Sequence, residues 1–242
     1  MENRRWIPGK YSGVRLIAHR GFTPAAPQNS IPAFTEAGMR KFWAIETDVH
    51  RTADGHLVCI HDATVDSTYK GSGAVREMTL KELLELERVE QEGLKIPLFS
   101  EYLRICRQAG AVPFIETKTE DIPQILQETA EWFRPDEVVM SSTKFHHLEM
   151  VRKLTEEVFI HHIFSDEDYA KQLKRMGKSG LSYKYSELED VPAGLIERTH
   201  EQGICVCLRA GDSPETVRRM LEMGLDYIPT NRTEPSSVDE RV

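Results

Sequence analysis

Three carboxylates in the first half of the chain have a spacing that could gather them around a metal ion. Glu46 and Asp48 are two residues apart in one apolar run, and Glu116 ends a later one. Side chains two apart in a strand point to the same face, where unpaired buried charge is unfavourable without a cation. A site of carboxylate oxygens suits Mg²⁺ or Ca²⁺ better than Zn²⁺, which prefers cysteine and histidine.

Histidines and cations stand at neighbouring positions that could handle protons and a phosphate group. His19 and Arg20 lie where the first apolar run ends. His61 ends another run, and Lys118 follows Glu116 by two residues. Histidine titrates near neutral pH and can act as general acid or base, whereas arginine and lysine attract phosphate oxygens. A metal site, two titratable groups and two cations are the components that phosphoester cleavage requires.

Each of these signals is weak when taken alone. A histidine at a strand end is usually a surface residue, and His61-Asp62 could be only a local hydrogen bond. It is the joint placement at successive strand ends that favours a catalytic site. Packing is the expected role of other conspicuous residues, namely His146-His147, His161-His162, Phe22, Trp43, Phe145 and Phe164.

The elements that must position these residues alternate along the chain. The apolar runs expected to be strands are Val14–His19, Ala44–His50, Leu57–His61, Val112–Glu116, Glu137–Ser141, Val158–Phe164, Leu181–Tyr185, Ile204–Leu208 and Tyr227–Pro229. About eight such runs alternate with amphipathic helical runs, which indicates βα units and a parallel sheet. Chain length and unit number predict a (β/α)8 TIM barrel, in which the carboxyl ends of the strands meet at one mouth. A doubly wound sheet usually carries a glycine-rich phosphate turn after its first strand, and here only Gly21 is present.

The chain is expected to form one domain over residues 1–242, with a small insertion at about 62–98 after the second strand unit. Asp54-Gly55 is a turn signal of the hairpin type, which would bring His61 back beside the second strand. Only Asn231–Val242 remain for an eighth helix. We therefore expect a short or irregular segment at that end of the barrel.

Composition excludes several classes of protein. The 242 residues carry 39 acidic and 31 basic side chains, a formal charge of −8, which argues against nucleic acid as a partner. No run reaches the ~20 apolar residues of a membrane span, and no signal peptide is evident, so a cytoplasmic location is predicted. The four cysteines, Cys59, Cys106, Cys205 and Cys207, are expected to be free buried thiols. Nothing indicates the oligomeric state.

The motifs that carry a specific family similarity lie between residues 16 and 118. They are Ile17-Ala18-His19-Arg20-Gly21, Pro27-Gln28-Asn29-Ser30, Glu46-Thr47-Asp48-Val49, Asp54-Gly55, His61-Asp62, Gly71-Ser72-Gly73, Met78-Thr79-Leu80-Lys81-Glu82-Leu83, Ile96-Pro97-Leu98 and Glu116-Thr117-Lys118. In this order they resemble the glycerophosphodiester phosphodiesterase family. The resemblance covers essentially the whole chain, although beyond about residue 140 it is a looser pattern.

The resemblance implies a (β/α)8 barrel with a small insertion and a divalent cation, Mg²⁺ or Ca²⁺. By position it makes His19 and His61 the acid/base pair, Glu46, Asp48 and Glu116 the metal ligands, and Arg20, Lys118 and Asn29 the substrate-binding residues. The implied reaction splits a glycerophosphodiester into glycerol 3-phosphate and an alcohol. The glycerol 2-hydroxyl attacks phosphorus with help from one histidine, the other protonates the leaving alcohol, and water opens the cyclic phosphate.

Some positions depart from the family pattern and leave the substrate open. Gln28 replaces the usual glutamate, Ser67 stands where arginine is frequent, and Asn231 replaces the usual aspartate. A tryptophan of the substrate mouth is replaced within Cys207-Leu208-Arg209, where Arg209 could contact an anion or be a solvated surface residue. Two alternatives therefore remain: a lysophospholipase-D-like activity on lipids, and a non-catalytic barrel that binds a phosphate ligand.

Overall fold

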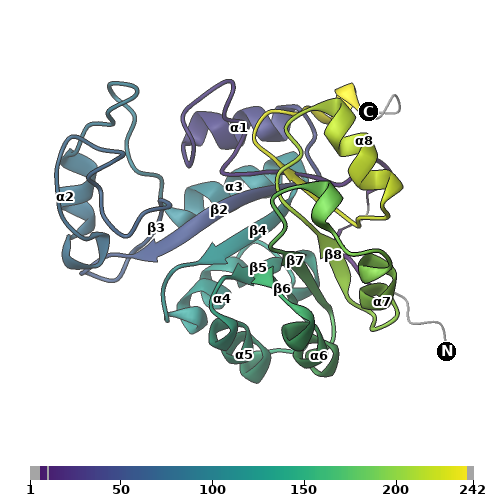
Figure 1. Ribbon diagram of the computed structural model, residues 1–242. Helices are drawn as coiled ribbons and strands as arrows, with labels where there is room; N and C mark the ends of the chain where they lie inside the picture. Colours follow the sequence, from purple (N-terminus) through teal and green to yellow (C-terminus); the bar gives the residue numbers. More distant parts are fainter. Residues whose placement is uncertain (1–5, 10, 239–242) are drawn as a thin grey trace.

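Eight parallel strands form the centre of the computed structural model, which describes residues 6–9 and 11–238 (Figure 1). The strands are β1 (Leu16–Ala18), β2 (Ala44–Arg51), β4 (Val112–Thr117), β5 (Val139–Ser142), β6 (Phe159–Ser165), β7 (Ser179–Tyr183), β8 (Cys205–Cys207) and β9 (Ile228–Thr230). They pair in the order β8-β7-β6-β5-β4-β2-β1-β9, so the last strand lies beside the first. The predicted barrel is confirmed, and among the described residues its one unpaired junction lies between β8 and β9.

Both faces of these strands are buried. Successive residues point alternately to the interior of the barrel and to the layer of helices outside it. In β1, Leu16 and Ala18 belong to the outer cluster that packs under the helices, whereas Ile17 belongs to the interior cluster. The same alternation in β2 puts Ala44 in the interior cluster and Ile45 in the outer one. Because the side-chain period of a strand is two, the later even positions of β2 also face the interior of the barrel.

Helices on the outside of the barrel follow the strands in chain order. They are α1 (Ile31–Met39), α3 (Phe99–Ala109), α4 (Ile122–Ala130), α5 (Phe145–Leu154), α6 (Glu167–Met176), α7 (Leu195–His200) and α8 (Pro214–Glu222). The hydroxyl of Ser30 caps α1 by accepting a hydrogen bond from the backbone N–H of Ala33. Gly110 ends α3 in a left-handed conformation with a φ of 68°. A serine at the amino-terminal cap and a left-handed glycine at the carboxyl end are common end signals of helices.

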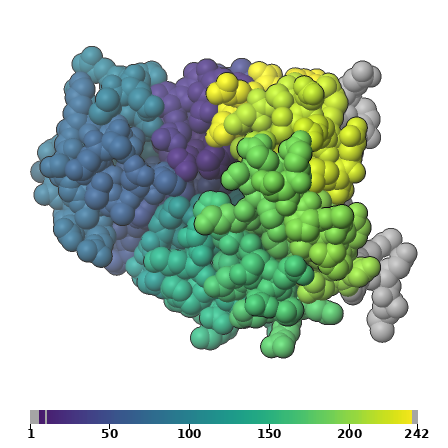
Figure 2. Space-filling model, viewed as in Figure 1, coloured from purple at the N-terminus to yellow at the C-terminus, as the bar shows by residue number. Residues whose placement is uncertain are grey.

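The chain between β2 and α3 leaves the barrel wall. Strand β3 (Leu57–Cys59) pairs antiparallel with β2, which confirms the predicted hairpin. Helix α2 (Leu80–Glu85) then packs with a small separate cluster that includes Val58, Tyr69 and Leu83. Figures 1 and 2 show this blue segment as a projection at one side of the molecule. Short 3-10 turns occur at Val75–Glu77, Pro135–Glu137, Leu188–Asp190 and Pro235–Ser237.

The far end of the chain carries little regular structure. After β9 the described residues contain only the 3-10 turn at Pro235–Ser237, so the expected short or irregular segment is confirmed there; residues 239–242 lie outside the described part. None of the helices in residues 6–9 and 11–238 is long and apolar enough to span a membrane.

Aromatic side chains fill the amino-terminal end of the barrel. Trp43 stacks with Tyr227 at 5.4 Å between ring centroids, and Trp6 contacts Phe159. A Cβ on Gly180 would lie 1.9 Å from the Tyr227 hydroxyl, so only glycine fits that position. All four cysteines are free and buried, as predicted. This packed layer lies opposite the end of the barrel where the strands finish.

Candidate active site

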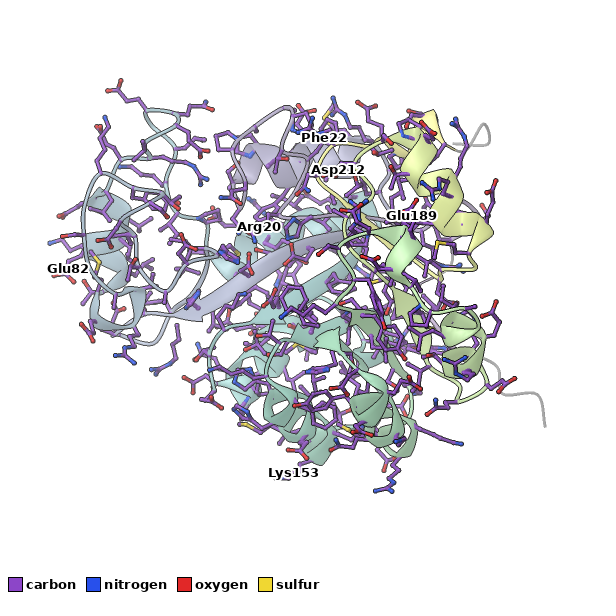
Figure 3. The ribbon with its side chains drawn as sticks, viewed as in Figure 1. Arg20, Phe22, Glu82, Lys153, Glu189 and Asp212 are labelled. Atoms are coloured by element: carbon purple, nitrogen blue, oxygen red, sulfur yellow. The ribbon has the colours of Figure 1, made fainter. Side chains whose placement is uncertain are left out.

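One cavity of about 380 Å³ opens at the carboxyl ends of the barrel strands. Its lining contains six of the predicted site residues, namely His19, Arg20, Glu46, His61, Glu116 and Lys118. Figure 3 shows Arg20 near the middle of the molecule beside β2, far from Glu82 on the projecting segment. The strand alternation of β2 and β4 turns their carboxylates toward this space.

The three predicted ligands form one buried carboxylate cluster. Oxygen atoms of Glu46, Asp48 and Glu116 all lie within 4.8 Å of one another, and the three residues are at most 8% exposed. Asp48 and Glu116 are register partners across the parallel pair β2–β4. The backbone N–H of Arg20 donates to Oε2 of Glu46 at 2.8 Å, which fixes that side chain against the end of β1.

Two cations partly balance this negative charge. Nε of Arg20 lies 3.4 Å from Oδ2 of Asp48. Nζ of Lys118 lies 3.1 Å from Oδ1 of Asp48 and also contacts Glu116. Although Lys118 is close, Oδ1 of Asp48 accepts no hydrogen bond of good geometry. The Arg20 guanidinium is held in turn by Gln28, whose amide oxygen accepts from Nη1 at 2.7 Å.

The pKa shifts of these groups show an excess of negative charge. Burial, and then the neighbouring Asp48, raise the pKa of Glu46 well above its ordinary value. The same two causes raise the pKa of Glu116. Burial opposes the charge of Lys118, but Asp48 and Glu116 outweigh it and raise the lysine pKa. The protein alone therefore does not stabilise all three carboxylates in their ionised form.

This donor set fits a divalent cation. Three carboxylates that converge in a buried site are stabilised by a hard ion that accepts oxygen ligands. A third cation, in addition to Arg20 and Lys118, would relieve the excess negative charge and favour the ionised form of the carboxylates. Among the described residues the other candidate metal cluster contains two histidines, and it lies outside the cavity lining.

His19 is held by a partner whose orientation is fixed. Its Nδ1 lies 2.8 Å from Oδ1 of Asn231, and Nδ2 of Asn231 donates to Asp212 at 2.8 Å. Since the amide nitrogen of Asn231 is used, its oxygen accepts from the Nδ1–H of His19, and Nε2 is left with a lone pair. Burial, followed by the positive charge of Arg20, lowers the pKa of His19. The ring is therefore neutral near pH 7.

His61 has a charged partner instead. Its Nδ1 lies 2.7 Å from Oδ1 of Asp62, whose other oxygen, Oδ2, accepts a hydrogen bond from the Ser67 hydroxyl. The hydrogen bond from Ser67, and then that from His61, lower the pKa of Asp62. An ionised carboxylate on Nδ1 orients the ring and stabilises the positive charge that it gains with a proton. Sequence reasoning noted Ser67 only as a departure, and here it supports this pair.

Asn29 lies behind the cavity and outside its lining. It is 3% exposed and has a positive φ of 47°. Its amide nitrogen donates to Oδ2 of Asp48 at 3.0 Å, and its oxygen accepts from the Thr47 hydroxyl at 2.8 Å. Both ends of the amide are thus engaged by the protein, and the residue orients a carboxylate of the cluster.

Most residues on the opposite side of the cavity were not predicted from the sequence to be site residues. It is formed by His161, Phe164, Ser182, Leu208 and Arg209. The expected packing role of Phe164 is wrong, because the residue is 62% exposed and has a positive φ of 59° after a break in the β6–β7 register. A bulge of this kind has no sequence signal, whereas the inward position of His161 follows from strand alternation. Arg209 lines the cavity, 3.7 Å from a carboxylate oxygen of Glu187.

Comparisons with known proteins agree with this architecture. The model of the glycerophosphoryl diester phosphodiesterase family matches residues 19–235. A glycerophosphodiester phosphodiesterase of Caldanaerobacter subterraneus subsp. tengcongensis is 28% identical over 233 residues, which cover 90% of this chain and 94% of that protein. An Oleispira antarctica phosphodiesterase, solved in complex with the product sn-glycerol-3-phosphate, has a TM-score of 0.83 at 21% identity, covering 93% of this chain and 95% of that one. A glycerophosphodiester phosphodiesterase from Agrobacterium tumefaciens has a TM-score of 0.78 at 24% identity, covering 93% and 99%. With a family match over nearly its whole length, the chain belongs to the glycerophosphoryl diester phosphodiesterase family.

Proposed function

We propose that this protein hydrolyses glycerophosphodiesters to glycerol 3-phosphate and an alcohol, with a divalent cation held by Glu46, Asp48 and Glu116. The observation that carries the proposal is the buried carboxylate cluster, which shares one cavity with two cations and two histidines. Family membership and the names of the relatives support the substrate class. A non-catalytic phosphate-binding barrel would not need both histidines oriented toward this cavity.

Formal charges support a cation in this cluster. The three carboxylates together with Arg20 and Lys118 leave one net negative charge, which repels a phosphodiester. A divalent ion would change the net charge to one positive, and the single charge of a phosphodiester would then bring it to zero. Mg²⁺ or Ca²⁺, when bound, supplies Lewis-acid stabilisation of the charge that develops on the phosphoryl oxygens.

The partners of the two histidines suggest different roles for them. His19 is neutral, and its Nε2 is the base for the proton that the glycerol 2-hydroxyl loses as its oxygen attacks phosphorus. His61, beside the ionised Asp62, carries the proton that the leaving alcohol oxygen receives. Water then opens the resulting cyclic phosphate with the two histidines in exchanged roles. Protons balance over the two steps, because each histidine ends as it began.

Arg20 and Lys118 bind the phosphate oxygens in this proposal. Both line the cavity and both already contact the carboxylate cluster. Gln28, in place of the glutamate usual in the family, leaves the guanidinium of Arg20 without a further acidic partner on that side. Asn29 acts as a positioning residue for Asp48 and contacts no substrate.

The alcohol would lie against the side of the cavity formed by β6–β8. Phe164 and Leu208 offer apolar contacts there, and Ser182 offers a hydroxyl. This mixture accommodates a small alcohol such as choline or ethanolamine. A lysophospholipid remains the second candidate substrate, since the exposed Phe164 ring stands at the mouth. Cytoplasmic location and the absence of a nucleic-acid partner stay predictions from the sequence.

The test is release of glycerol 3-phosphate from glycerophosphocholine and glycerophosphoethanolamine, compared with lysophosphatidylcholine. We expect turnover of the water-soluble diesters, loss of activity in EDTA and recovery with Mg²⁺ or Ca²⁺. A matched control is His56→Ala, which removes an exposed histidine outside the cavity. No turnover of any of these substrates by the folded, cation-loaded protein would contradict the proposal.

A further inference from the structure

A second group of possible ligands lies on the rim of the barrel, outside the cavity lining. Glu120 follows β4, and His146 and His147 stand in the first turn of α5, which follows β5. One ligand atom of each residue lies within 4.8 Å of the others. Lys118 and Thr143, which line the cavity, precede this group by two and three residues. The group therefore stands beside the mouth and shares no residue with the carboxylate cluster.

The distances from the two imidazoles to Glu120 are a few tenths of an ångström shorter than the ligand separations of a tetrahedral metal site. Nε2 of His146 lies 3.1 Å from both carboxylate oxygens of Glu120, and Nε2 of His147 lies 3.0 Å from Oε1. Metal–ligand bonds of about 2.0–2.1 Å place the ligand atoms of a tetrahedron about 3.3–3.4 Å apart. A small movement of exposed side chains would thus admit an ion, since Glu120 and His146 are 59% and 52% exposed.

His147 gives independent support for a ligand at this position. Its side chain is fully buried, and its Nε2, although 3.0 Å from Oε1 of Glu120, makes no hydrogen bond of good geometry. Nδ1 lies 3.0 Å from the hydroxyl oxygen of Ser142. With the proton on Nδ1, Ser142 accepts it, and Nε2, 3.0 Å from Oε1 of Glu120, is left with a free lone pair. This arrangement is the one that orients metal-bound imidazoles in general.

Positive charges near Glu120, His146 and His147 could oppose the binding of a cation. Lys144 has its ammonium 3.8 Å from Oε1 of Glu120, but that side chain is 56% exposed and free to turn into solvent. The amino-terminal end of α5 carries partial positive charge, which disfavours a cation and also keeps an imidazole neutral. Imidazole nitrogens with one carboxylate are the ligands that transition ions prefer over Mg²⁺.

We propose that Glu120, His146 and His147 form a transition-metal site that binds Zn²⁺ and joins the loop after β4 to the start of α5. The fourth position of the ion faces solvent, because two of the three ligands are exposed. The site is separate from the carboxylate cluster in ligand chemistry: imidazole nitrogen favours zinc, and carboxylate oxygen alone favours Mg²⁺ or Ca²⁺. It does not depend on the proposed phosphodiesterase activity.

The test is calorimetric titration of the full-length protein with Zn²⁺ in a large excess of Mg²⁺, which fills the carboxylate cluster. We expect one zinc ion per chain, with His146→Ala and Glu120→Gln each weakening affinity by at least the 10- to 100-fold that loss of an outer partner of a ligand costs. Both altered side chains are exposed, so the variants should fold, which circular dichroism checks. His56→Ala, another exposed histidine beside a carboxylate, should bind zinc like the wild type.

A second readout is the visible spectrum of Co²⁺ in place of zinc, in the same excess of Mg²⁺. Intense absorption from a tetrahedral cobalt ion should appear in the wild type and in His56→Ala and be lost in His146→Ala. Equal zinc affinity in the wild type, His146→Ala and Glu120→Gln would overturn the proposal, as would equal weakening in His56→Ala. Absence of any zinc binding by the wild type would overturn it too.

Discussion

The two sides of the cavity differ in how firmly their residues are held. On the side formed by β1, β2 and β4, Glu46 and Asp48 are buried, and each contacts a cation or a backbone N–H. On the side formed by β6–β8, Phe164 is 62% exposed, and Arg209 lies 3.7 Å from a carboxylate oxygen of Glu187. The charged groups of the first side contact one another, whereas the side chains of the second side are placed independently of one another.

This difference teaches where chemistry and selectivity are located. Charge stabilisation and proton transfer require groups with fixed positions and shifted pKa values, and these occur on the first side. A wall that contacts only the leaving alcohol can change without loss of the reaction. Substitutions on the first side should therefore reduce kcat for every substrate, whereas substitutions on the second should change the preference among substrates.

The largest effect is expected from Glu46→Gln. Loss of one buried carboxylate weakens cation binding, and the charge stabilisation that the cation supplies is worth several kcal/mol, about 10³-fold in rate. Steady-state kinetics at saturating diester with increasing Mg²⁺ or Ca²⁺ measures both effects. An unchanged dependence of rate on cation concentration would show that Glu46 is no ligand.

His19→Ala and His61→Ala should each lower kcat by about 10²- to 10⁴-fold, the usual contribution of a general acid or base. KM should change little, because neither ring is assigned to hold the phosphate. The control is His50→Ala, at a half-buried histidine outside the cavity lining whose Nε2 contacts the backbone oxygen of His61. A rate near the wild-type value in His19→Ala or His61→Ala would show that the replaced histidine is not the general acid or base.

The pH dependence of activity should reflect the environment of His19. Burial and Arg20 lower its pKa, so the base stays deprotonated below pH 6.5, the ordinary value for histidine. The acidic limb of kcat/KM should therefore lie below pH 6.5. An acidic limb above that pH would contradict the assignment of His19 as the base.

Stability should depend on pH and cation together. The pKa values of Glu46 and Glu116 are raised in the folded protein, so their contribution is fully present below about pH 4.5 and is lost as pH rises through the folded values. A divalent cation should restore this loss, and thermal melting should show a larger gain from Ca²⁺ at pH 7 than at pH 5. Glu46→Gln should reduce the gain at pH 7, and an equal gain at both pH values in the wild type would argue against the cluster as the site.

The smallest effect is expected on the second side. Phe164→Ala should change kcat/KM by about tenfold or less, through KM, and by different factors for choline and ethanolamine diesters. Leu84→Ala, at an exposed apolar side chain of the projecting segment, is the control. Equal losses of kcat for both diesters would contradict the assignment of substrate preference to the second side and of catalysis to the first.

Much of the first side could be predicted from the sequence, because its signals are local and follow strand periodicity. Glu46 and Asp48 share a face by alternation, and the Asp54-Gly55 turn returns His61 to the same end of the sheet. The second side depends on features without such a signal. The bulge that exposes Phe164 follows from β6–β7 pairing. On the first side, the engagement of both ends of the Asn29 amide also lacked a local signal, because it follows from neighbours distant along the chain.

The most direct measurement of the central claim is a crystal structure of the protein soaked with Mn²⁺ as an anomalous scatterer in place of Mg²⁺. The account predicts one peak in the cavity, about 2.0–2.6 Å from oxygens of Glu46, Asp48 and Glu116, with the Lys118 ammonium displaced from at least one of its present carboxylate contacts. A cavity in which Lys118 keeps both contacts and no peak lies among the three carboxylates, at a Mn²⁺ concentration that supports turnover, would contradict it.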